Sequence, residues 1–227
     1  NYGRLINGRF NEPETHFFLD KVFAESRQEG FHFVDIGCNV GEFVLDYASH
    51  ANVNAVTAFD AQAEQIETVK KTVELNSFVN VELINQPVSD KEELIYFNVA
   101  PNSTASGINQ MDKQGQELLA TTIDASFDHD NDDTFVFLID TEGAELSIMK
   151  GGLDLIRKSA PLIIFEYNHV TRRHFGLNNV RDLLGQDYDL FRLRKDGLLD
   201  QSFERTWNVV AMPRHGKFDY LKSLVKY

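Results

Sequence analysis

The sequence predicts an α/β fold in which helices cover a mostly parallel sheet, and three observations support this prediction. Between residues 31 and 85, short apolar runs alternate with helical patterns in the β-α-β-α-β order that is typical of a parallel sheet. Two more apolar runs, 134–140 and 161–167, flank a further helical pattern. The last two strand-like runs are joined by too few residues for a crossover helix, so we expect them to be antiparallel.

The first part of the chain is expected to form three strands with helices before and between them. A helix is expected over 13–29, because Pro13 suits a first helical turn and Phe17 is one of several apolar residues near one face. Apolar residues at helical spacing predict a helix after the first strand and another from Ile66 to about Asn76. The three strands are FHFVDI (31–36), NAVTAFD (54–60) and VELIN (81–85).

An inserted strand pair interrupts the alternation between the third and fourth core strands. ELIYFNV (93–99) and ELLATTIDASF (117–127) both look strand-like, and a polar loop joins them.

The rest of the chain is expected to complete the sheet. The helix after the fourth strand is expected to break at Gly151-Gly152, and a short helix is expected over 178–185. We see no internal repeat and no linker, so a single domain is expected over 1–227. The remaining core strands are TFVFLID (134–140), PLIIFEY (161–167), YDLFRLR (188–194) and TWNVVAM (206–212).

The chain is acidic, with 22 Lys+Arg against 35 Asp+Glu and a net charge of -13. Nucleic-acid binders show the opposite balance, because their affinity comes largely from neutralised phosphates, so we expect no nucleic-acid partner. We find no apolar run long enough for a membrane span and no signal-peptide pattern, which leaves a cytoplasmic location as the default expectation. The chain begins at Asn1, so we expect a domain excised from a longer polypeptide. The single cysteine, Cys38, is expected to be a buried thiol.

A glycine-rich turn, VDIGCNVGEF (34–43), joins the first strand to its helix and is a candidate ligand site. A P-loop would need a Lys-Ser/Thr pair after Gly41, where the chain has Glu42-Phe43. A dinucleotide turn would need glycines at Asn39 and Glu42, and the Glu42 carboxylate would repel a pyrophosphate. The turn is therefore not expected to bind a phosphate.

S-adenosylmethionine suits this turn better, because it carries an ammonium and a sulfonium and has no phosphate. Gly37 and Gly41 permit close backbone approach to its amino-acid end, and Asp35 and Glu42 are compatible with its positive groups. Asp60 ends the second strand 19 residues after Gly41, near the spacing of about 20 that is typical of ribose-binding carboxylates.

The strongest motif lies after the fourth strand. FLIDTEGAELSIMKGG (137–152), followed by PLIIFEYNH (161–169), resembles the conserved block of the FkbM family of S-adenosylmethionine-dependent methyltransferases, with Thr141 at a position that is usually valine. The resemblance runs from about residue 31 to residue 170 and so covers most of the chain.

Two earlier motifs are also similar to this family. VDIGCNVGEF matches its glycine turn, with Cys38 at a position that is usually alanine. FDAQAEQIETVKKTVELN (59–76) resembles the motif that follows the second strand, with Asp60 for glutamate and Ala61 for proline. The hydrogen-bond acceptor is kept, whereas the rigid turn after it is not.

The resemblance implies a class I methyltransferase fold, which is Rossmann-like: a seven-stranded, mostly parallel sheet with an antiparallel last strand, here with the inserted strand pair. It also implies S-adenosylmethionine as cofactor and O-methylation, commonly of sugar or polyketide hydroxyls. We expect a sugar or glycan acceptor, with deoxysugars such as rhamnose or fucose among the candidates, and a glycosyltransferase as a natural neighbour in a longer polypeptide. Asp140-Thr141-Glu142-Gly143 stands where enzymes that methylate nucleic-acid amino groups often carry N/D-P-P-Y/F.

Asp140, Glu142, Glu166 and His169 end the fourth and fifth strands and are expected to converge on the methyl group as catalytic residues. Asp140 is expected at the junction of cofactor and acceptor, and one of these acids or His169 is expected to remove the hydroxyl proton. His169 could equally be a surface residue. The residues expected to line the cofactor are Asp35, Gly37, Cys38, Asn39, Gly41, Asp60, Ala61, Val88, Ser89 and Asp140.

Structural alternatives stay open for several of these assignments. Asp140 could cap the helix that follows it, and Glu166 could pair with Arg172 or Arg173. The hydroxyl-rich loop 102–107 could face the acceptor or be a plain hairpin loop. The acids are hard oxygen ligands, but no spacing demands a metal ion, so we assign none.

Other functions also stay open. A nicotinamide-dependent oxidoreductase would share the architecture, but Asn39 and Glu42 argue against it. A non-catalytic binding module is disfavoured by the intact acids. Among methyltransferases, a polyketide or another small-molecule hydroxyl is the alternative acceptor.

Overall fold

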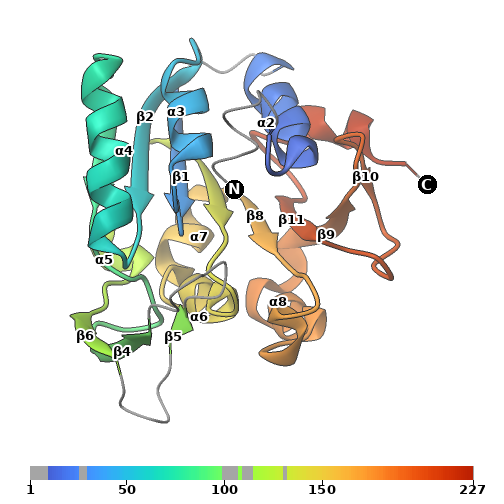
Figure 1. Cartoon of the computed structure of the whole chain (residues 1–227). Coiled ribbons are helices and arrows are strands. Elements are labelled where there is room, and N and C mark those ends of the chain that lie inside the picture. Colours follow the sequence, from blue (N-terminus) through green and yellow to red (C-terminus); the bar gives the residue numbers. More distant parts are fainter. Residues whose placement is uncertain (1–9, 26–29, 99–106, 109–114, 130–131, 227) are drawn as a thin grey trace.

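The computed structural model describes residues 10–25, 30–98, 107–108, 115–129 and 132–226. An eight-stranded sheet runs through the described part of the chain (Figure 1). In spatial order its strands are β10 (Leu199–Asp200), β9 (Tyr188–Leu193), β11 (Asn208–Pro213), β8 (Leu162–Glu166), β7 (Thr134–Ile139), β1 (Phe31–Ile36), β2 (Val53–Phe59) and β3 (Val81–Ile84).

The predicted fold class is confirmed. The strands β3, β2, β1, β7 and β8 are parallel, and β11 runs antiparallel to both of its neighbours, β8 and β9. The central strands β7, β8 and β11 are buried along their whole length, which explains why they appear in the sequence as continuous apolar runs. All seven expected core strands are present, and the two-residue edge strand β10 makes the eighth.

Helices cover both faces of the sheet. One face carries α2 (Pro13–Glu25), α3 (Glu42–Ala48) and α4 (Ala63–Leu75), and the other carries α5 (Ile123–Ser126), α6 (Glu145–Lys150), α7 (Leu153–Ser159) and α8 (Leu177–Leu184). Three short 3-10 helices are η1 (Thr171–Arg173), η2 (Gly185–Asp187) and η3 (Asp219–Leu224). Buried side chains form one apolar cluster on each face of the sheet. We call the cluster under α2, α3 and α4 the α2 cluster, and the cluster under α5 to α8 the α6 cluster.

Side chains of each strand alternate between these two clusters. In β1, Phe33 packs in the α2 cluster, whereas Val34 and Ile36 pack in the α6 cluster. Asp35 therefore points to the α2 side of the sheet, where it is 2% exposed. This alternation decides which polar side chains can meet at the ends of the strands.

The inserted segment forms a separate small sheet of β4 (Leu94–Asn98), β5 (Gly107–Ile108) and β6 (Gln116–Leu119). Figure 1 shows it beyond the arrowheads of β1 and β2, on the side of their carboxyl ends. The expected strand 117–127 is wrong in its second half, because β6 ends at Leu119 and α5 follows. The Thr122 hydroxyl accepts the Ala125 N–H at 3.0 Å, a capping bond that starts the helix.

Some predicted boundaries also shift. The helix expected over 13–29 is seen as far as Glu25, and residues 26–29 lie outside the described part. Phe17 was expected on the buried face and is 45% exposed. The break at Gly151-Gly152 between α6 and α7 is confirmed.

Two further expectations concern the loop 102–107 and a membrane span. Most of the loop 102–107 lies outside the described residues. Within the described ranges, no helix has both the length and the hydropathy that a membrane span requires.

Candidate active site

Four residues form one row where the parallel strands β1, β7 and β8 end and the antiparallel strand β11 begins. The register of β1, β7 and β8 places Gly37, Asp140 and Glu166 at the same level. Asn208 of β11 is the register partner of Glu166. Because Phe165 packs in the α6 cluster, the next side chain, Glu166, points to the α2 side of the sheet.

The glycine turn lies against this row. Gly37 has a φ of 92°, and a Cβ built on it would stand 1.9 Å from the carbonyl oxygen of Asp140. The N–H groups of Gly37 and Cys38 both donate to the carbonyl of Phe59, at 2.9 and 3.1 Å. Only glycine can adopt this backbone conformation and leave room for the Asp140 carbonyl at the seam between β1 and β7.

Asp60 ties the end of β2 to the same turn. Its two carboxylate oxygens accept the N–H groups of Asn39 and Gln62, each at 2.8 Å. Burial raises the pKa of Asp60, and these backbone hydrogen bonds oppose the rise. Each oxygen keeps a free lone pair, so the oriented carboxylate fits two ribose hydroxyls. The neighbouring Ala61 is partly exposed.

Asp35 carries a buried carboxyl group below the turn. Its Oδ2 has no hydrogen-bond partner among the described residues. Burial, together with the nearby charges of Asp60 and Glu12, raises the pKa of Asp35 to about 8. Burial also raises the pKa of the Cys38 thiol well above its usual value, as expected for a packed, unreactive cysteine.

Asp140 and Glu166 form a carboxyl pair, because they stand side by side at the ends of the neighbouring strands β7 and β8. Burial raises the pKa of both groups, to about 8 for Glu166 and well above the usual value for Asp140, and each is raised further by its acidic neighbours. Asp140 is partly exposed and Glu166 is buried, which leaves Asp140 as the member that a second substrate can reach.

The alternative in which Glu166 pairs with Arg172 or Arg173 is not seen among the described residues. Glu166 accepts a hydrogen bond from Asn168, and neither nearby arginine pairs with it in the described part of the chain. Arg172 instead donates to the carbonyl groups of Tyr167 and Phe203.

Glu145, rather than Asp140, supports the turn before α6. Its Oε1 accepts the N–H groups of Thr141 and Gly143, each at 3.0 Å, and the Thr141 hydroxyl at 3.2 Å. Glu142 lies in this turn with a φ of 57°, in the left-handed region. Burial, followed by the charge of Glu145, raises the pKa of Glu142. The turn therefore presents Glu142 while Glu145 holds its backbone.

A family description, "Methyltransferase FkbM domain", matches residues 35–192, which is well over half of the chain. The chain belongs to the FkbM methyltransferase family. This match contains the glycine turn, Asp60 and the Asp140–Glu166 pair. The family resemblance expected from the sequence motifs is confirmed.

Solved structures with similar folds include two methyltransferases. An FkbM methyltransferase from Methylobacillus flagellatus KT superposes with a TM-score of 0.56 at 16% identity, covering 88% of this chain and 52% of that chain. This chain thus spans about half the length of that structure. A Streptococcus mutans methyltransferase solved in complex with SAH gives a TM-score of 0.51 at 13% identity, over 90% of this chain and 98% of that chain. Identities this low show the fold alone, and no curated protein matches the sequence.

The two histidines near this site are both exposed. His169 follows β8, and no contact of its side chain is seen among the described residues. The His174 ring lies against the turn before α6, because a Cβ on Gly143 would stand 2.6 Å from its Cδ2. The role of His169 as general base stays a prediction.

Val88 and Ser89 lie after β3, against the inserted segment. Val88 forms an isolated bridge with Thr121, and the Ser89 N–H donates to the Thr121 carbonyl at 2.8 Å. Ser89 is 4% exposed, and its carbonyl packs on Gly151. Their place in the cofactor site stays a prediction. Within the described ranges, no group of three or more His, Cys, Asp or Glu residues is placed to hold a metal ion.

The motifs did not reveal Glu12, which precedes α2. Its Oε2 accepts hydrogen bonds from the Asn208 amide at 2.6 Å and from the Thr15 hydroxyl at 3.1 Å. Since Asn208 is the register partner of Glu166, Glu12 lies beside the row of residues described above. Its charge is among those that raise the pKa of Asp35 and Glu166. No sequence signal marks it, because Glu12 and Asn208 are 196 positions apart.

His16 fixes the start of α2 to α3. Its ring contacts Asp46 at 2.8 Å and Glu42 at 3.1 Å, and it lies between the rings of Phe10 and Phe43. Burial lowers the pKa of His16, but the hydrogen bonds and charges of the two carboxylates raise it to about 9. A buried imidazolium therefore holds the segment that carries Glu12.

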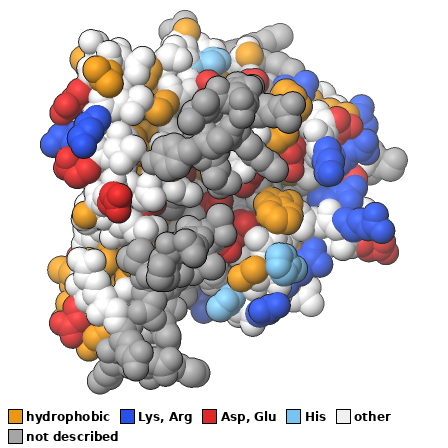
Figure 2. All heavy atoms as spheres, viewed as in Figure 1, with side chains coloured by type: hydrophobic (Ala, Val, Ile, Leu, Met, Phe, Trp, Pro, Cys, Tyr) orange, Lys and Arg blue, Asp and Glu red, His pale blue; other side chains and the backbone are white. Residues whose placement is uncertain are grey.

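Acidic and basic side chains occupy different parts of the surface. Figure 2 shows acidic side chains in the middle of the visible face and Lys and Arg gathered on one side of it.

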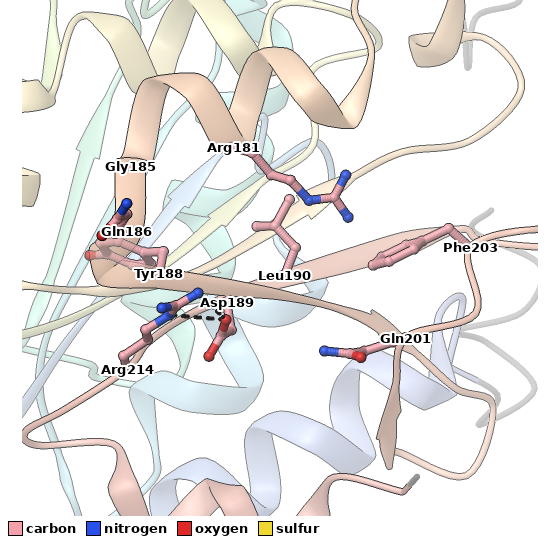
Figure 3. Close-up of a pocket in the computed structure, with 9 residues that line it drawn as sticks. All are labelled: Arg181, Gly185, Gln186, Tyr188, Asp189, Leu190, Gln201, Phe203 and Arg214. Atoms are coloured by element: carbon pink, nitrogen blue, oxygen red, sulfur yellow. Dashed lines mark hydrogen bonds and ion pairs between the residues drawn. The ribbon is translucent and has the colours of Figure 1, made fainter.

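A separate cavity of about 380 Å³ lies between α8 and β9 (Figure 3). It is lined by Arg181, Tyr188, Phe203 and Arg214, among others, and reaches the amino end of β9, opposite the row at Gly37. None of the predicted site residues lines this cavity.

Proposed function

We propose that this FkbM methyltransferase transfers the methyl group of S-adenosylmethionine to a hydroxyl of a sugar or glycan. The observation that carries the proposal is the Asp140–Glu166 carboxyl pair, which stands in one row with Gly37. When bound, the cofactor supplies an electrophilic methyl group on a sulfonium. The residues of this chain hold the two reactants and take up a proton.

The first half of the sheet suits the cofactor. The turn after β1 would take its amino-acid end, and the two oriented oxygens of Asp60 suit its ribose hydroxyls. Asp35 offers an unpaired buried oxygen on the same side. Glu42 was expected near the positive groups, but its Oε1 accepts the Asn11 N–H at 2.8 Å and also contacts His16. We therefore leave Glu42 out of the cofactor site.

The second half of the sheet suits a hydroxyl acceptor. Asp140 is partly exposed, and its carboxyl group can accept a hydrogen bond from the hydroxyl that is methylated. As the new C–O bond forms and the C–S bond breaks, the hydroxyl proton passes to the Asp140–Glu166 pair, which acts as the general base. Glu142 and Glu12 provide further acceptors nearby, so a polyol such as a sugar is bound through several hydroxyls.

The charge of the site supports a neutral acceptor. Acidic side chains surround the pair, and they would repel a phosphate or carboxylate on the second substrate. Such repulsion disfavours nucleic acids, but it does not separate sugars from other small neutral alcohols. A polyketide hydroxyl is therefore the second candidate acceptor.

A methyl-transfer screen tests the proposal. The protein is incubated with S-adenosylmethionine labelled in the methyl group and with methyl rhamnoside, methyl fucoside, methyl glucoside, a hydroxylated macrolide and glucose 6-phosphate. We expect label on a neutral sugar, and Asp140→Asn is expected to lower the rate by about 10²- to 10⁴-fold. The matched control is Asp154→Asn on the exposed start of α7, which should leave the rate unchanged.

Two outcomes would overturn the proposal. Label on the macrolide alone would move the acceptor class to polyketides. A transfer rate that Asp140→Asn leaves unchanged would show that the carboxyl pair does not take the proton.

A further inference from the structure

The cavity between α8 and β9 takes residues from both faces of the sheet (Figure 3). Tyr188 and Leu190 belong to the α6 cluster, so their side chains point to the face that α8 covers. Asp189 stands between them in β9 and therefore points to the opposite face. The volume of about 380 Å³ lies within the range of ~300–1,000 Å³ that is typical of small-molecule sites. The cavity thus has room for a ligand larger than an isolated ion.

One wall of the cavity carries a positive charge that is held in place. Arg181, in the last turn of α8, donates to the side-chain oxygen of Asn178 at 3.0 Å. Its guanidinium also lies over the ring of Phe203, with Cζ 5.6 Å from the ring centroid. No carboxylate in the described part of the chain pairs with Arg181. A guanidinium that is positioned but not neutralised is a suitable partner for an oxyanion.

Arg214 adds a second guanidinium to the lining. Its Nε and Nη2 both contact Oδ1 of Asp189, at 3.1 and 2.9 Å. The lining therefore has two guanidinium groups and one carboxylate.

The surrounding part of the chain is also basic. Residues 150–227 contain 14 of the 22 Lys and Arg but only 9 of the 35 Asp and Glu, so the acidic excess of the protein lies before them. Figure 2 shows Lys and Arg on the side of the molecule where Figure 1 draws β9 and β10. The charge of this region favours an anionic ligand.

Two side-chain amides give the cavity further hydrogen-bonding groups. Gln186 lies in η2 and Gln201 follows β10, and both are exposed and line the cavity. Neither amide makes a side-chain hydrogen bond within the described residues. Each offers two N–H donors and an acceptor oxygen, which suits hydroxyl groups that both donate and accept. Leu190 and Phe203 offer apolar contacts to the carbon atoms of the same ligand.

We propose that this cavity binds an acidic sugar, that is, a sugar that carries a carboxylate or a phosphate group. Its oxyanion lies against Arg181 and Arg214, and its hydroxyl groups meet Gln186 and Gln201. The site is separate from the row at Gly37, where acidic side chains disfavour an anion. The acidic sugar is therefore a second ligand and not the group that is methylated. The inference does not depend on the proposed function, because binding is measured without the cofactor.

Calorimetry with four probes tests the inference. The probes are glucuronate, glucose 6-phosphate, glucose and inorganic phosphate. We expect the two acidic sugars to bind about tenfold more tightly than glucose or phosphate alone. Arg181→Gln is expected to weaken both acidic sugars by about tenfold, because a charge-assisted hydrogen bond is lost. The matched control is Arg157→Gln on the exposed surface of α7, which should bind the probes like the wild type.

Asp189→Asn tests the site in the opposite direction. It removes the carboxylate that pairs with Arg214 and leaves that guanidinium to the ligand. We expect both acidic sugars to bind about threefold more tightly, which is within the range of one exposed ion pair. A gain of affinity cannot come from a variant that fails to fold. An unchanged affinity would contradict the role of Arg214.

Four other results would overturn the proposal. Equal affinity for glucose and glucuronate would show that the charge is not recognised. Equal affinity for inorganic phosphate and glucose 6-phosphate would show that the sugar is not recognised. The remaining two are a wild type that binds neither acidic sugar and an Arg181→Gln variant that binds them as the wild type does. Methyl transfer is measured separately, so none of these results decides the proposed function.

Discussion

The carbonyl oxygen of Asp140 stands 1.9 Å from the place that a Cβ on Gly37 would occupy. Gly37→Ala must therefore push β1 and β7 apart at the seam of the site. Gly216 also has a positive φ, of 108°, but a Cβ there would meet nothing within 4 Å. We expect Gly216→Ala to cost about 1 kcal/mol of unfolding free energy from backbone strain alone, and Gly37→Ala to cost over ~2 kcal/mol. Urea unfolding measures both, and equal losses would contradict the close contact.

Asp60 orients the glycine turn as well as offering its carboxylate to a ligand. In Asp60→Asn, one amide NH₂ must face the N–H of Asn39 or Gln62, so one of those hydrogen bonds is lost. We expect affinity for S-adenosylhomocysteine and for 5′-methylthioadenosine to fall together, by about tenfold, because both ligands carry the ribose. Glu64→Gln, on the exposed surface of α4, is the control. A loss confined to the ligand with the amino-acid end would show that Asp60 does not hold the ribose.

The buried carboxyl of Asp35 predicts how stability depends on pH. Its pKa in the folded protein is about 8, against about 3.9 in an unfolded chain. The folded state therefore binds more protons, and its stability falls as pH rises from about 4 to about 8. Asp35→Asn should remove part of this fall, on the order of a few kcal/mol. The measurement is the unfolding midpoint of the wild type and of Asp35→Asn at pH 5 and at pH 8. If both proteins lose the same stability between these pH values, the pKa of Asp35 is not raised.

His16 predicts a dependence of stability at higher pH. Its pKa is raised to about 9 by Asp46 and Glu42, so its contribution is complete below about 6.5 and is lost as pH rises through about 9. We expect His16→Gln to cost about 2 kcal/mol at pH 7, because it leaves Glu42 without its cation. The exposed His215→Gln is the control. Thermal unfolding from pH 7 to pH 10 measures the difference, and a cost that persists unchanged at pH 10 would rule out the imidazolium.

Much of the fold follows from patterns that a sequence can show. The strands β1 and β7 begin where the apolar runs begin, because a parallel strand buried on both faces must be apolar throughout. The glycine turn and the block after the fourth strand also give the candidate site, since both lie within a few residues of a strand end. The error in 117–127 has a local cause. The capping hydrogen bond of Thr122 starts a helix, and the pattern of apolar residues does not predict such a bond.

The parts that the sequence could not show depend on tertiary register. Glu12 joins the site only because β11 runs antiparallel beside β8 and brings Asn208 opposite Glu166. In the same way, Glu145 lies in the first turn of α6, yet its carboxylate holds the backbone N–H groups of Thr141 and Gly143. The spacing of apolar and polar residues along the chain predicts neither contact.

In the row at the strand ends, different parts of the chain are proposed to bind the methyl donor and the acceptor. The proposed donor contacts come mainly from the turn after β1 and the end of β2, whereas the proposed acceptor contacts follow β7 and β8. Substitutions after β7 and β8 can therefore change which alcohol is bound as acceptor, while the residues that bind the methyl donor stay the same. The exception is the seam, where the Asp140 backbone meets Gly37 and both halves must change together or not at all.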